Sequence, residues 1–421
     1  MPNYINRTIE KLIEQMHGKF PAIMISGARQ AGKSTVLQYI AAISRTEIKE
    51  VSLDDLNERD LAQTDPELFL RVHGTPLIID EFQYAPGLLS YIKIAIDKAR
   101  KDALFGSGKS AGTLYYLTGS QVFETIEGLT ESLAGRIGII DLHPLSMREI
   151  CAKQEDIFVP DIQKLVSKSK VEYGGMLSLF ERIFRGSYPE LYRDRDMPLE
   201  VFFSSYVRTY IERDVRRIIN IQDEPKFMKF ISAMAARTGQ EFNATDIAKD
   251  IEVSADTVSK WTSVLTNTYI IHLLQPHSNN NIARIIKRPK IYFMDTGLAC
   301  YLTGYVSGET LMRSAYSGQI FETYVVSEIV KSYTNNGKDP KKHLYYYRDS
   351  NGKEIDLLVV NGDEIYPVEI KKSANPKKDA VKHFSLVDKF EMASPNGIVI
   401  CLTEEVHALD KKNYMLPIEY I

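Results

Sequence analysis

The sequence predicts an α/β protein with three domains, at residues 1–205, 206–300 and 301–421. Three observations lead to this prediction. A glycine-rich loop joins an apolar strand to a helix near the N-terminus, helix–turn–helix spacing follows in the middle, and two carboxylates and a lysine lie on neighbouring strands near the C-terminus. At roughly 150 residues per domain, a chain of 421 residues accommodates this division.

The composition narrows the class of protein. Hydrophobic residues make up 44% and charged residues 25%, which are globular proportions and exclude a disordered chain. No apolar run approaches the ~18 residues that a membrane span requires, so we expect no membrane partner. Residues 1–20 mix charges with apolar residues at helical spacing, so we expect a docking helix instead of a signal peptide, and a cytoplasmic location. Three distant cysteines favour neither a disulfide framework nor a cysteine zinc site.

The glycine-rich loop has the spacing of a phosphate-binding site. Residues 21–26 form an apolar strand, the next eight residues (GARQAGKS) satisfy GxxxxGK[ST], and a helical pattern follows. The backbone N–H groups of such a loop point at phosphate oxygens, so we expect ATP or ADP here, with Lys33 at the β- and γ-phosphates and Ser34 at Mg²⁺. The expected nucleotide-binding residues are Gly27, Ala28, Arg29, Gln30, Ala31, Gly32, Lys33, Ser34 and Thr35.

A second apolar strand, at residues 77–81, ends in the acidic pair Asp80 and Glu81. Asp80 at the carboxyl end of this strand is expected to hold the metal, and Glu81 to polarise an attacking water. Because a kinase transferring phosphate to a bound hydroxyl does not need the second carboxylate, the pair favours hydrolysis. The alternative is an acidic pair that closes an ordinary strand.

Two further features suggest a complete ATPase site. A third strand, at residues 114–120, ends in Thr118 and Ser120, which we expect to orient the water or sense the γ-phosphate. Arg136 follows a turn of small residues and is a candidate finger that completes the site of a neighbouring subunit, which predicts a homo-oligomer. A plain surface arginine is the alternative.

The middle segment has the spacing of a winged helix and the one net positive charge among the three. A helix is expected at residues 206–219, two more at 244–251 and 255–266, and wing strands at 269–274 and 290–293. The wing and the helix at residues 206–219 are expected to contact DNA phosphates by their positive charge; joining domains or subunits is the alternative. The arginines of that helix are Arg208, Arg213, Arg216 and Arg217. The basic residues on or beside the wing are Arg284, Lys287, Arg288 and Lys290.

Near the C-terminus, three strands are expected at residues 344–348, 354–360 and 364–370. A hairpin turning at residues 362–363 places Asp356 opposite Glu369, with Lys371 on the same face. Two facing carboxylates call for a cation, and the hard, oxygen-seeking Mg²⁺ or Mn²⁺ fits them.

Lys371 beside these acids can orient a water or stabilise charge on a phosphodiester, and Glu322 is the matching acid on the preceding helix. This is the D…ExK signature of the restriction-endonuclease-like fold. A site that only binds nucleic acid, or a salt-bridged strand edge, is the alternative. The lysines beside the site, which can hold phosphates or form a solvated face, are Lys372, Lys377, Lys378 and Lys382.

Six segments occur along the chain in the order GARQAGKS, LIIDEFQ, YLTGSQ, SLAGR, LHPLS and GSYPE. Together they resemble the AAA+-related prokaryotic P-loop ATPases in which a winged helix and a restriction-endonuclease-like domain follow the nucleotide domain. The resemblance covers nearly the whole chain and implies an AAA+-like P-loop NTPase domain first. Many relatives have two glycines where this chain has the single Gly186, which affects the local loop.

Position by position, the resemblance places Gly32, Lys33 and Ser34 at phosphates and metal. The resemblance also implies that Asp80 and Glu81 act at the metal and the water. It implies further that Thr118 and Ser120 are sensor residues and that Arg136 is the candidate finger. The expected function is Mg²⁺-dependent ATP binding and hydrolysis that gates DNA binding or cleavage by the C-terminal domain. The alternative is a nucleotide-switched regulatory or scaffold protein whose silent nuclease-like domain binds DNA or a protein.

Overall fold

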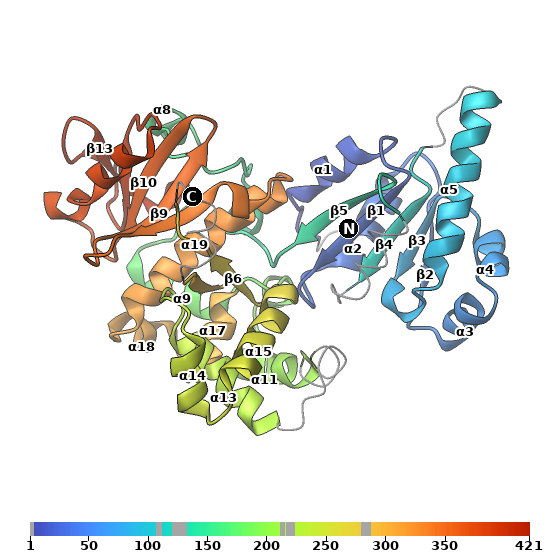
Figure 1. Cartoon of the computed structure of the whole chain (residues 1–421), viewed down its shortest axis with the longest axis horizontal. Coiled ribbons are helices and arrows are strands. Elements are labelled where there is room, and N and C mark those ends of the chain that lie inside the picture. The colour runs from blue at the N-terminus through green and yellow to red at the C-terminus, as the bar shows by residue number, and fades with distance from the viewer. Residues whose placement is uncertain (1–3, 107–111, 120–132, 211–214, 216–223, 279–287) are drawn as a thin grey trace.

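The computed structural model describes residues 4–106, 112–119, 133–210, 215, 224–278 and 288–421. Figure 1 shows the N-terminal sheet and the C-terminal sheet on opposite sides of the molecule, with a group of helices below and between them. The predicted residues that lie outside the described ones are Ser120, Arg213, Arg216, Arg217, Arg284 and Lys287.

The N-terminal sheet has five parallel strands in the order β2-β3-β4-β1-β5. Its strands are β1 (Ala22–Gly27), β2 (Lys49–Ser52), β3 (Leu77–Asp80), β4 (Tyr115–Gly119) and β5 (Ile137–Leu142). Every residue of β1 is buried, as expected of a parallel strand covered on both faces. The strands predicted at residues 21–26, 77–81 and 114–120 are therefore confirmed as neighbours.

Helices cover both faces of this sheet. One face packs against α1 (Ile9–Met16) and α2 (Lys33–Ile43), and the other packs against α4 (Pro66–His73) and α5 (Leu88–Phe105), with α3 (Leu56–Thr64) beside them. Ile9 and Ile13 of α1 are fully buried, so the docking helix predicted within residues 1–20 is confirmed. The carboxyl ends of β1, β3 and β4 then meet at one edge of the sheet.

The chain after β5 is largely helical until the C-terminal sheet. The helices are α7 (Met147–Ile150), α8 (Ile162–Val166), α9 (Met176–Arg185), α10 (Glu190–Arg193), α11 (Leu199–Tyr210), α13 (Glu224–Ala236), α14 (Ala244–Ile251), α15 (Ala255–Asn267), α17 (Thr296–Leu302), α18 (Gly308–Arg313) and α19 (Ser317–Asn335). The side chains of Asn243 and Ser254 cap α14 and α15. The strands β6 (Ile271–Leu274) and β7 (Lys290–Phe293) pair antiparallel, so the elements of the predicted winged helix are present.

The C-terminal sheet has six strands in the order β12-β13-β11-β10-β9-β8. They are β8 (Leu344–Arg348), β9 (Glu354–Asn361), β10 (Glu364–Ile370), β11 (Gly397–Cys401), β12 (His407–Ala408) and β13 (Asn413–Pro417). Short 3₁₀ turns are η1 (Phe82–Tyr84), η3 (Pro340–Lys342), η4 (Lys378–Val381), η5 (Phe384–Phe390) and η6 (Ile418–Tyr420). The β9–β10 hairpin pairs Ile365 with Val360 and Val368 with Leu357, which is the predicted register.

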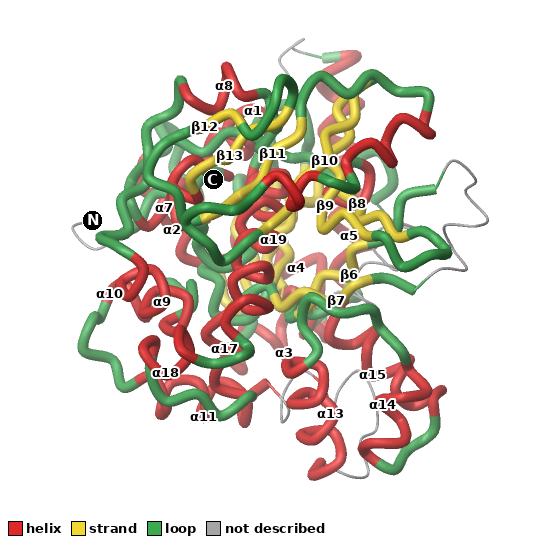
Figure 2. Tube along the Cα trace, turned by 90° about the vertical axis from the view of Figure 1, so that its left-hand side faces the viewer, coloured by secondary structure: helices red, strands yellow, loops and turns green. Residues whose placement is uncertain are grey.

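One hydrophobic core runs through the chain from Met147 to Ile418, whereas the N-terminal sheet has two cores of its own. Helix α19 is buried along nearly its whole length and lies centrally in both views of the chain (Figures 1 and 2). The helix predicted from residue 206 begins instead at Leu199, because Pro198 ends the preceding loop, and α11 runs through the predicted boundary between residues 205 and 206. The boundary between the cores of the N-terminal sheet and the core of the following chain lies between Leu142 and Met147.

None of the described helices combines the length and apolar character needed to cross a membrane.

A buried acid at the junction of these cores titrates abnormally. Glu155 is 6% exposed, and its carboxylate accepts a hydrogen bond from Nδ2 of Asn335 at 2.7 Å. Burial, followed by the negative charge of Glu149, raises the pKa of Glu155 from its ordinary 4.5 to about 7. The folded chain therefore binds this proton more tightly than the unfolded chain does.

Glu155→Gln should flatten the pH dependence of stability. Because the folded state holds the extra proton, the free energy of unfolding of the wild type falls as pH rises from about 4.5 to 7. One pKa unit corresponds to about 1.4 kcal/mol. The difference in free energy of unfolding between the variant and the wild type should therefore shift in favour of the variant by roughly 1–3 kcal/mol between pH 4 and pH 8. Urea unfolding at both pH values measures it, with the exposed neighbour change Asp156→Asn as control. Equal pH slopes in wild type and Glu155→Gln would contradict the expectation.

Candidate functional site

The phosphate loop joins the end of β1 to the start of α2. At Gly27, φ is +151°, and a Cβ atom would stand 2.0 Å from the carbonyl oxygen of Leu142. Glycine is therefore required where the loop leaves the sheet. The loop delivers the chain directly into α2 at Lys33, so the unpaired N–H groups of this helix N-terminus face the space where an anion binds.

Lys33 lies folded over this loop and is 8% exposed. Its Nζ donates hydrogen bonds to the carbonyl oxygens of Gly27 at 3.1 Å and Ala28 at 2.9 Å. The ammonium is therefore held in the hollow of the loop, and its contact with the terminal phosphates stays a prediction.

Three side chains from three neighbouring elements meet beside the loop. Ser34 Oγ donates to Asp80 Oδ1 at 2.7 Å, and the hydroxyl of Thr118 donates to the same oxygen. The backbone N–H of Glu81 lies 3.3 Å from Thr118 Oγ1. The order β3-β4-β1 causes this meeting, because it brings the ends of the three strands to one place. A hydroxyl and a carboxylate are oxygen donors of the kind that Mg²⁺ prefers, so the residues fit the expected ion.

Glu81 is held in an unusual backbone conformation, with φ at +54°, which a residue with a side chain adopts only at a cost of about 1 kcal/mol or more. The side-chain amide of Gln83 donates to its carboxylate Oε2. Gln83 was not assigned a role from the sequence, although it lies within the LIIDEFQ segment. It orients the acid that we expect to activate water.

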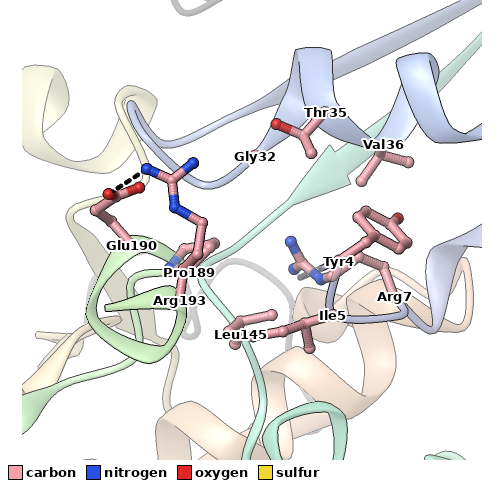
Figure 3. A pocket seen from close by; sticks show the side chains of 10 residues that line it. All are labelled: Tyr4, Ile5, Arg7, Gly32, Thr35, Val36, Leu145, Pro189, Glu190 and Arg193. Carbon is pink, nitrogen blue, oxygen red and sulfur yellow. Dashed lines mark hydrogen bonds and ion pairs between the residues drawn. The ribbon is translucent and has the colours of Figure 1, made fainter. Parts of the chain in front are cut away.

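A cavity of about 310 Å³ opens beside the phosphate loop (Figure 3). In this view Tyr4, Ile5 and Arg7 lie across the cavity from Thr35 and Val36. The tyrosine ring stacks on Tyr39, with centroids 4.1 Å apart. The full lining is Tyr4, Ile5, Arg7, Gly32, Thr35, Val36, Leu145, Pro189, Glu190 and Arg193.

The opposite rim of this cavity comes from the GSYPE segment and the short helix after it. Arg193 forms an ion pair with Glu190 there (Figure 3). The single glycine of the segment is required, because at Gly186 φ is +79° and a Cβ would stand 2.6 Å from the carboxylate of Asp295. The sequence analysis assigned these rim residues no role at the nucleotide, because they lie about 160 positions from the loop and the GSYPE segment contributed only to the family resemblance.

Arg136 does not lie at the phosphate loop of its own chain. It precedes β5, and its carbonyl accepts a hydrogen bond from Ala22 N at the start of β1, at the opposite end of the sheet from the loop. Its Nε and Nη2 donate to Asp97 at 2.7 and 3.0 Å. A finger role for Arg136 stays a prediction that concerns a neighbouring copy of the chain.

In the C-terminal sheet, β9 and β10 bring the predicted acids and lysine together. Lys371 Nζ lies 2.5 Å from Glu369 Oε1 and 3.6 Å from Asp356 Oδ2. The backbone N–H of Ile370 donates to Asp356 at 2.9 Å. Burial, and then the charge of Asp356, raises the pKa of Glu369 to about 7, against the opposing effect of Lys371. Two carboxylates forced together in this way fit a bound cation.

Glu322 is engaged by residues of the predicted wing. Its carboxylate accepts a hydrogen bond from the hydroxyl of Tyr292 at 2.6 Å and pairs with Lys290 Nζ at 3.3 Å. Lys290 also pairs with Glu354 at 2.5 Å, and its side chain is 4% exposed. The prediction that Lys290 offers its charge to DNA is therefore wrong, because β7 packs inward. Among the described residues, no group of three or more His, Cys, Asp or Glu side chains is arranged to hold a metal.

A cleft of about 450 Å³ opens over Asp356 and Glu369. Lys377 and Lys382 are exposed at its rim, with His383 beside them. Lys372 is turned away from this role, since its Nζ donates to Ser317 Oγ at 2.7 Å and to the carbonyl of Met312. Lys378, also exposed, is not among the lining residues. Two of the four predicted lysines thus border the cleft with side chains open to solvent.

Comparisons with known proteins divide the chain into three matched segments. Residues 19–151 match a family model described as an AAA domain. Residues 176–308 and 317–421 match two models that are each described as a domain of unknown function (DUF8612 and DUF4143). Uncharacterized proteins of Mycobacterium bovis and Mycobacterium tuberculosis are each 25% identical over 371 residues, 87% of this chain and 74% of theirs.

Two solved structures show distant likeness. A Walker-type ATPase of Pyrococcus abyssi is 15% identical, with a TM-score of 0.44, over 71% of this chain and 96% of its own. The ORC2 protein of Aeropyrum pernix is 13% identical, with a TM-score of 0.32, over 77% of this chain and 92% of its own.

The matched AAA segment contains the phosphate loop together with Lys33, Ser34, Asp80, Glu81 and Thr118. The winged helix and the restriction-endonuclease-like fold of the later segments stay predictions. Residues 19–151 therefore form an AAA-related P-loop ATPase domain.

Proposed function

We propose that this chain is a Mg²⁺-dependent ATPase whose nucleotide state gates the binding of DNA in the C-terminal cleft. The observation that carries the ATPase part is the meeting of Ser34, Asp80 and Thr118 beside the ammonium of Lys33. A hydroxyl, a carboxylate and an ammonium at the start of a helix are the groups that hold a metal-bound triphosphate.

The nucleotide lies with its phosphates over the N-terminus of α2 and its base in the 310 Å³ cavity. The walls there are mostly apolar, and Tyr4 offers a ring against which a planar base can pack. Arg193 lines the same cavity as Gly32 of the loop, and it turns to a phosphate when it releases Glu190.

The residues beside the phosphate loop have different roles in hydrolysis. Lys33 exchanges its carbonyl partners for phosphate oxygens, and Ser34 and Asp80 are the residues that hold Mg²⁺, which neutralises phosphate charge when bound. Glu81, oriented by Gln83, accepts a proton from the attacking water.

The charges of the C-terminal cleft support a polyanionic partner. Lys371, Lys377 and Lys382 supply positive charge around the opening, and Asp356 and Glu369 are the residues that hold a divalent cation, which adds further positive charge when bound. Phosphate contacts require only this charge, so binding without sequence preference is expected.

Cleavage of the bound strand is a second candidate function. The specific observation in its favour is that Lys371 contacts both carboxylates, which is the D…ExK arrangement. The engagement of Glu322 by Lys290 and Tyr292 favours binding without cleavage, the alternative in which the site is silent.

Lys33→Ala should abolish ATP turnover and also weaken nucleotide binding roughly tenfold or more, because the transferring phosphate and the bound nucleotide both lose a charge-assisted hydrogen bond. Glu81→Gln should instead keep nucleotide affinity and lose phosphate release. Fluorescent nucleotide titration and a phosphate-release assay measure the two effects, with exposed Lys101→Ala as control. Wild-type turnover by Lys33→Ala, or failure of the purified wild type to release phosphate with or without DNA, would count against the ATPase.

Neutralising the cleft rim with Lys377→Gln and Lys382→Gln together should weaken DNA binding at all sequences alike. Each lost phosphate contact lowers the slope of log affinity against log salt by about 1, so the double variant should lose about 2. Fluorescence anisotropy with a labelled duplex at several salt concentrations measures it. The matched control is Lys98→Gln with Lys101→Gln on α5; if this pair weakens binding equally, or if the wild type binds no DNA, a protein partner replaces DNA in the proposal.

Asp356→Ala should abolish any cleavage of plasmid DNA by the wild type in Mn²⁺, because the cation loses one of its two carboxylates. Asp379→Asn, which lines the same cleft without touching Lys371, should cleave as the wild type does. Agarose gels of nicked and linear plasmid report the result. Intact plasmid with the wild type would refute the second candidate and leave binding as the function.

A further inference from the structure

A buried guanidinium ties the phosphate loop to the chain behind it. Arg7 is 5% exposed and uses all three of its nitrogens. Nη1 donates to the carbonyl of Ala31 within the loop at 2.8 Å, Nη2 donates to the carbonyl of His143 at 2.8 Å, and Nε pairs with Glu149 at 3.0 Å. Arg7 also precedes residues 19–151, so it lies outside the segment that matches the AAA domain.

Glu149 anchors this guanidinium to the first turn of α7. Its Oε1 accepts from Thr8 N at 2.7 Å, and its Oε2 accepts from Ser146 N at 3.0 Å. The Ser146 hydroxyl in turn accepts from Glu149 N, which completes a capping box. The acid is thus fixed by its own helix, and Arg7 is fixed to the acid.

The same turn is bonded to α19. Met147 N donates to Glu328 at 2.6 Å, and Glu328 pairs with Lys331 at 2.8 Å. Lys331 Nζ also donates to the carbonyl of Leu145 at 3.0 Å and to Ser187 Oγ at 3.2 Å. Leu145 lines the nucleotide cavity, and Ser187 stands two residues before the lining residue Pro189. Helix α19 is therefore bonded to one lining residue of that cavity and to the segment that leads into its Pro189 rim.

Helix α19 also carries Glu322 of the C-terminal site, six residues before Glu328 and so less than two turns away. Glu149, Glu328 and Lys331 are all buried. A buried charge left without its partner is costly, so these bonds rearrange together and not singly. Such a set of bonds has few alternative arrangements, as a switch between two states requires.

We propose that Arg7 is a positioning residue of the nucleotide site, and that the buried chain Arg7–Glu149–Glu328–Lys331 couples nucleotide occupancy to α19. The inference rests on the proposed nucleotide binding and describes how the effect of a bound nucleotide is passed to α19 and so to Glu322. A phosphate in the loop changes the position of the Ala31 carbonyl, Arg7 follows it, and the first turn of α7 passes the change to Glu328.

The test compares Arg7→Gln with Arg148→Gln in the full chain. Arg148 is the matched control, since it is 3% exposed, adjoins Glu149, and donates hydrogen bonds to carbonyl oxygens of Gln154, Ser169 and Tyr420, none of which belongs to the phosphate loop. Nucleotide affinity is measured with a fluorescent ADP analogue, and hydrogen exchange of residues 317–335 is measured with and without saturating ADP. Arg7→Gln should bind ADP about tenfold more weakly and show no ADP-dependent change of exchange, whereas Arg148→Gln should keep both. Wild-type behaviour of Arg7→Gln, or equal losses in Arg148→Gln, would overturn the proposal.

A second variant keeps the test decisive if Arg7→Gln does not fold. Glu328→Gln preserves shape and leaves the phosphate loop untouched, so it should bind ADP with wild-type affinity and lose the exchange response of residues 317–335. A retained response would overturn the coupling. Failure of the wild type to bind ADP at all would instead refute the proposed function.

Discussion

The buried ion pair between Arg7 and Glu149 governs how the nucleotide domain sits against the rest of the chain. Both side chains are 2% exposed, so each carries a large desolvation cost. The cost is offset because every nitrogen of Arg7 and both oxygens of Glu149 have hydrogen-bond partners. Such a pair tolerates few geometries, and it sets where the back of the phosphate loop lies relative to α7.

Local patterns were sufficient to predict the parts of the two sites that lie on single elements. The phosphate loop was predictable because its glycines and Lys33 fall between a strand and a helix. The β9–β10 register was predictable because a two-residue turn sets every pair that follows, and the structure pairs Ile365 with Val360 as expected. The meeting of Ser34 with Asp80 required only that β1, which leads into α2, and β3 be parallel strands of one sheet.

The features that the sequence did not disclose depend on contacts across long separations. Arg7 meets Glu149 across 142 positions, and no local spacing marks either residue. Lys290 was misread because a sequence shows charge but not burial: β7 places it between Glu322 and Glu354, where a wing exposed to solvent was expected. The start of α11 was misplaced for a related reason, since the arginines after residue 206 suggested a helix that in fact begins at Leu199.

The charges around the C-terminal cleft explain why a cation belongs there before a polyanion does. Among the described residues, the acids Glu322, Glu354, Asp356 and Glu369 face the two ammonium groups of Lys290 and Lys371. Arg348 adds little, because it is 45% exposed and shared with Glu241. When all four acids are ionised, the balance is two negative charges, which one divalent cation cancels. Without such a cation, the charges on the floor of the cleft repel a phosphate that the lysine rim attracts, so under the proposed function the cation would bind before the DNA.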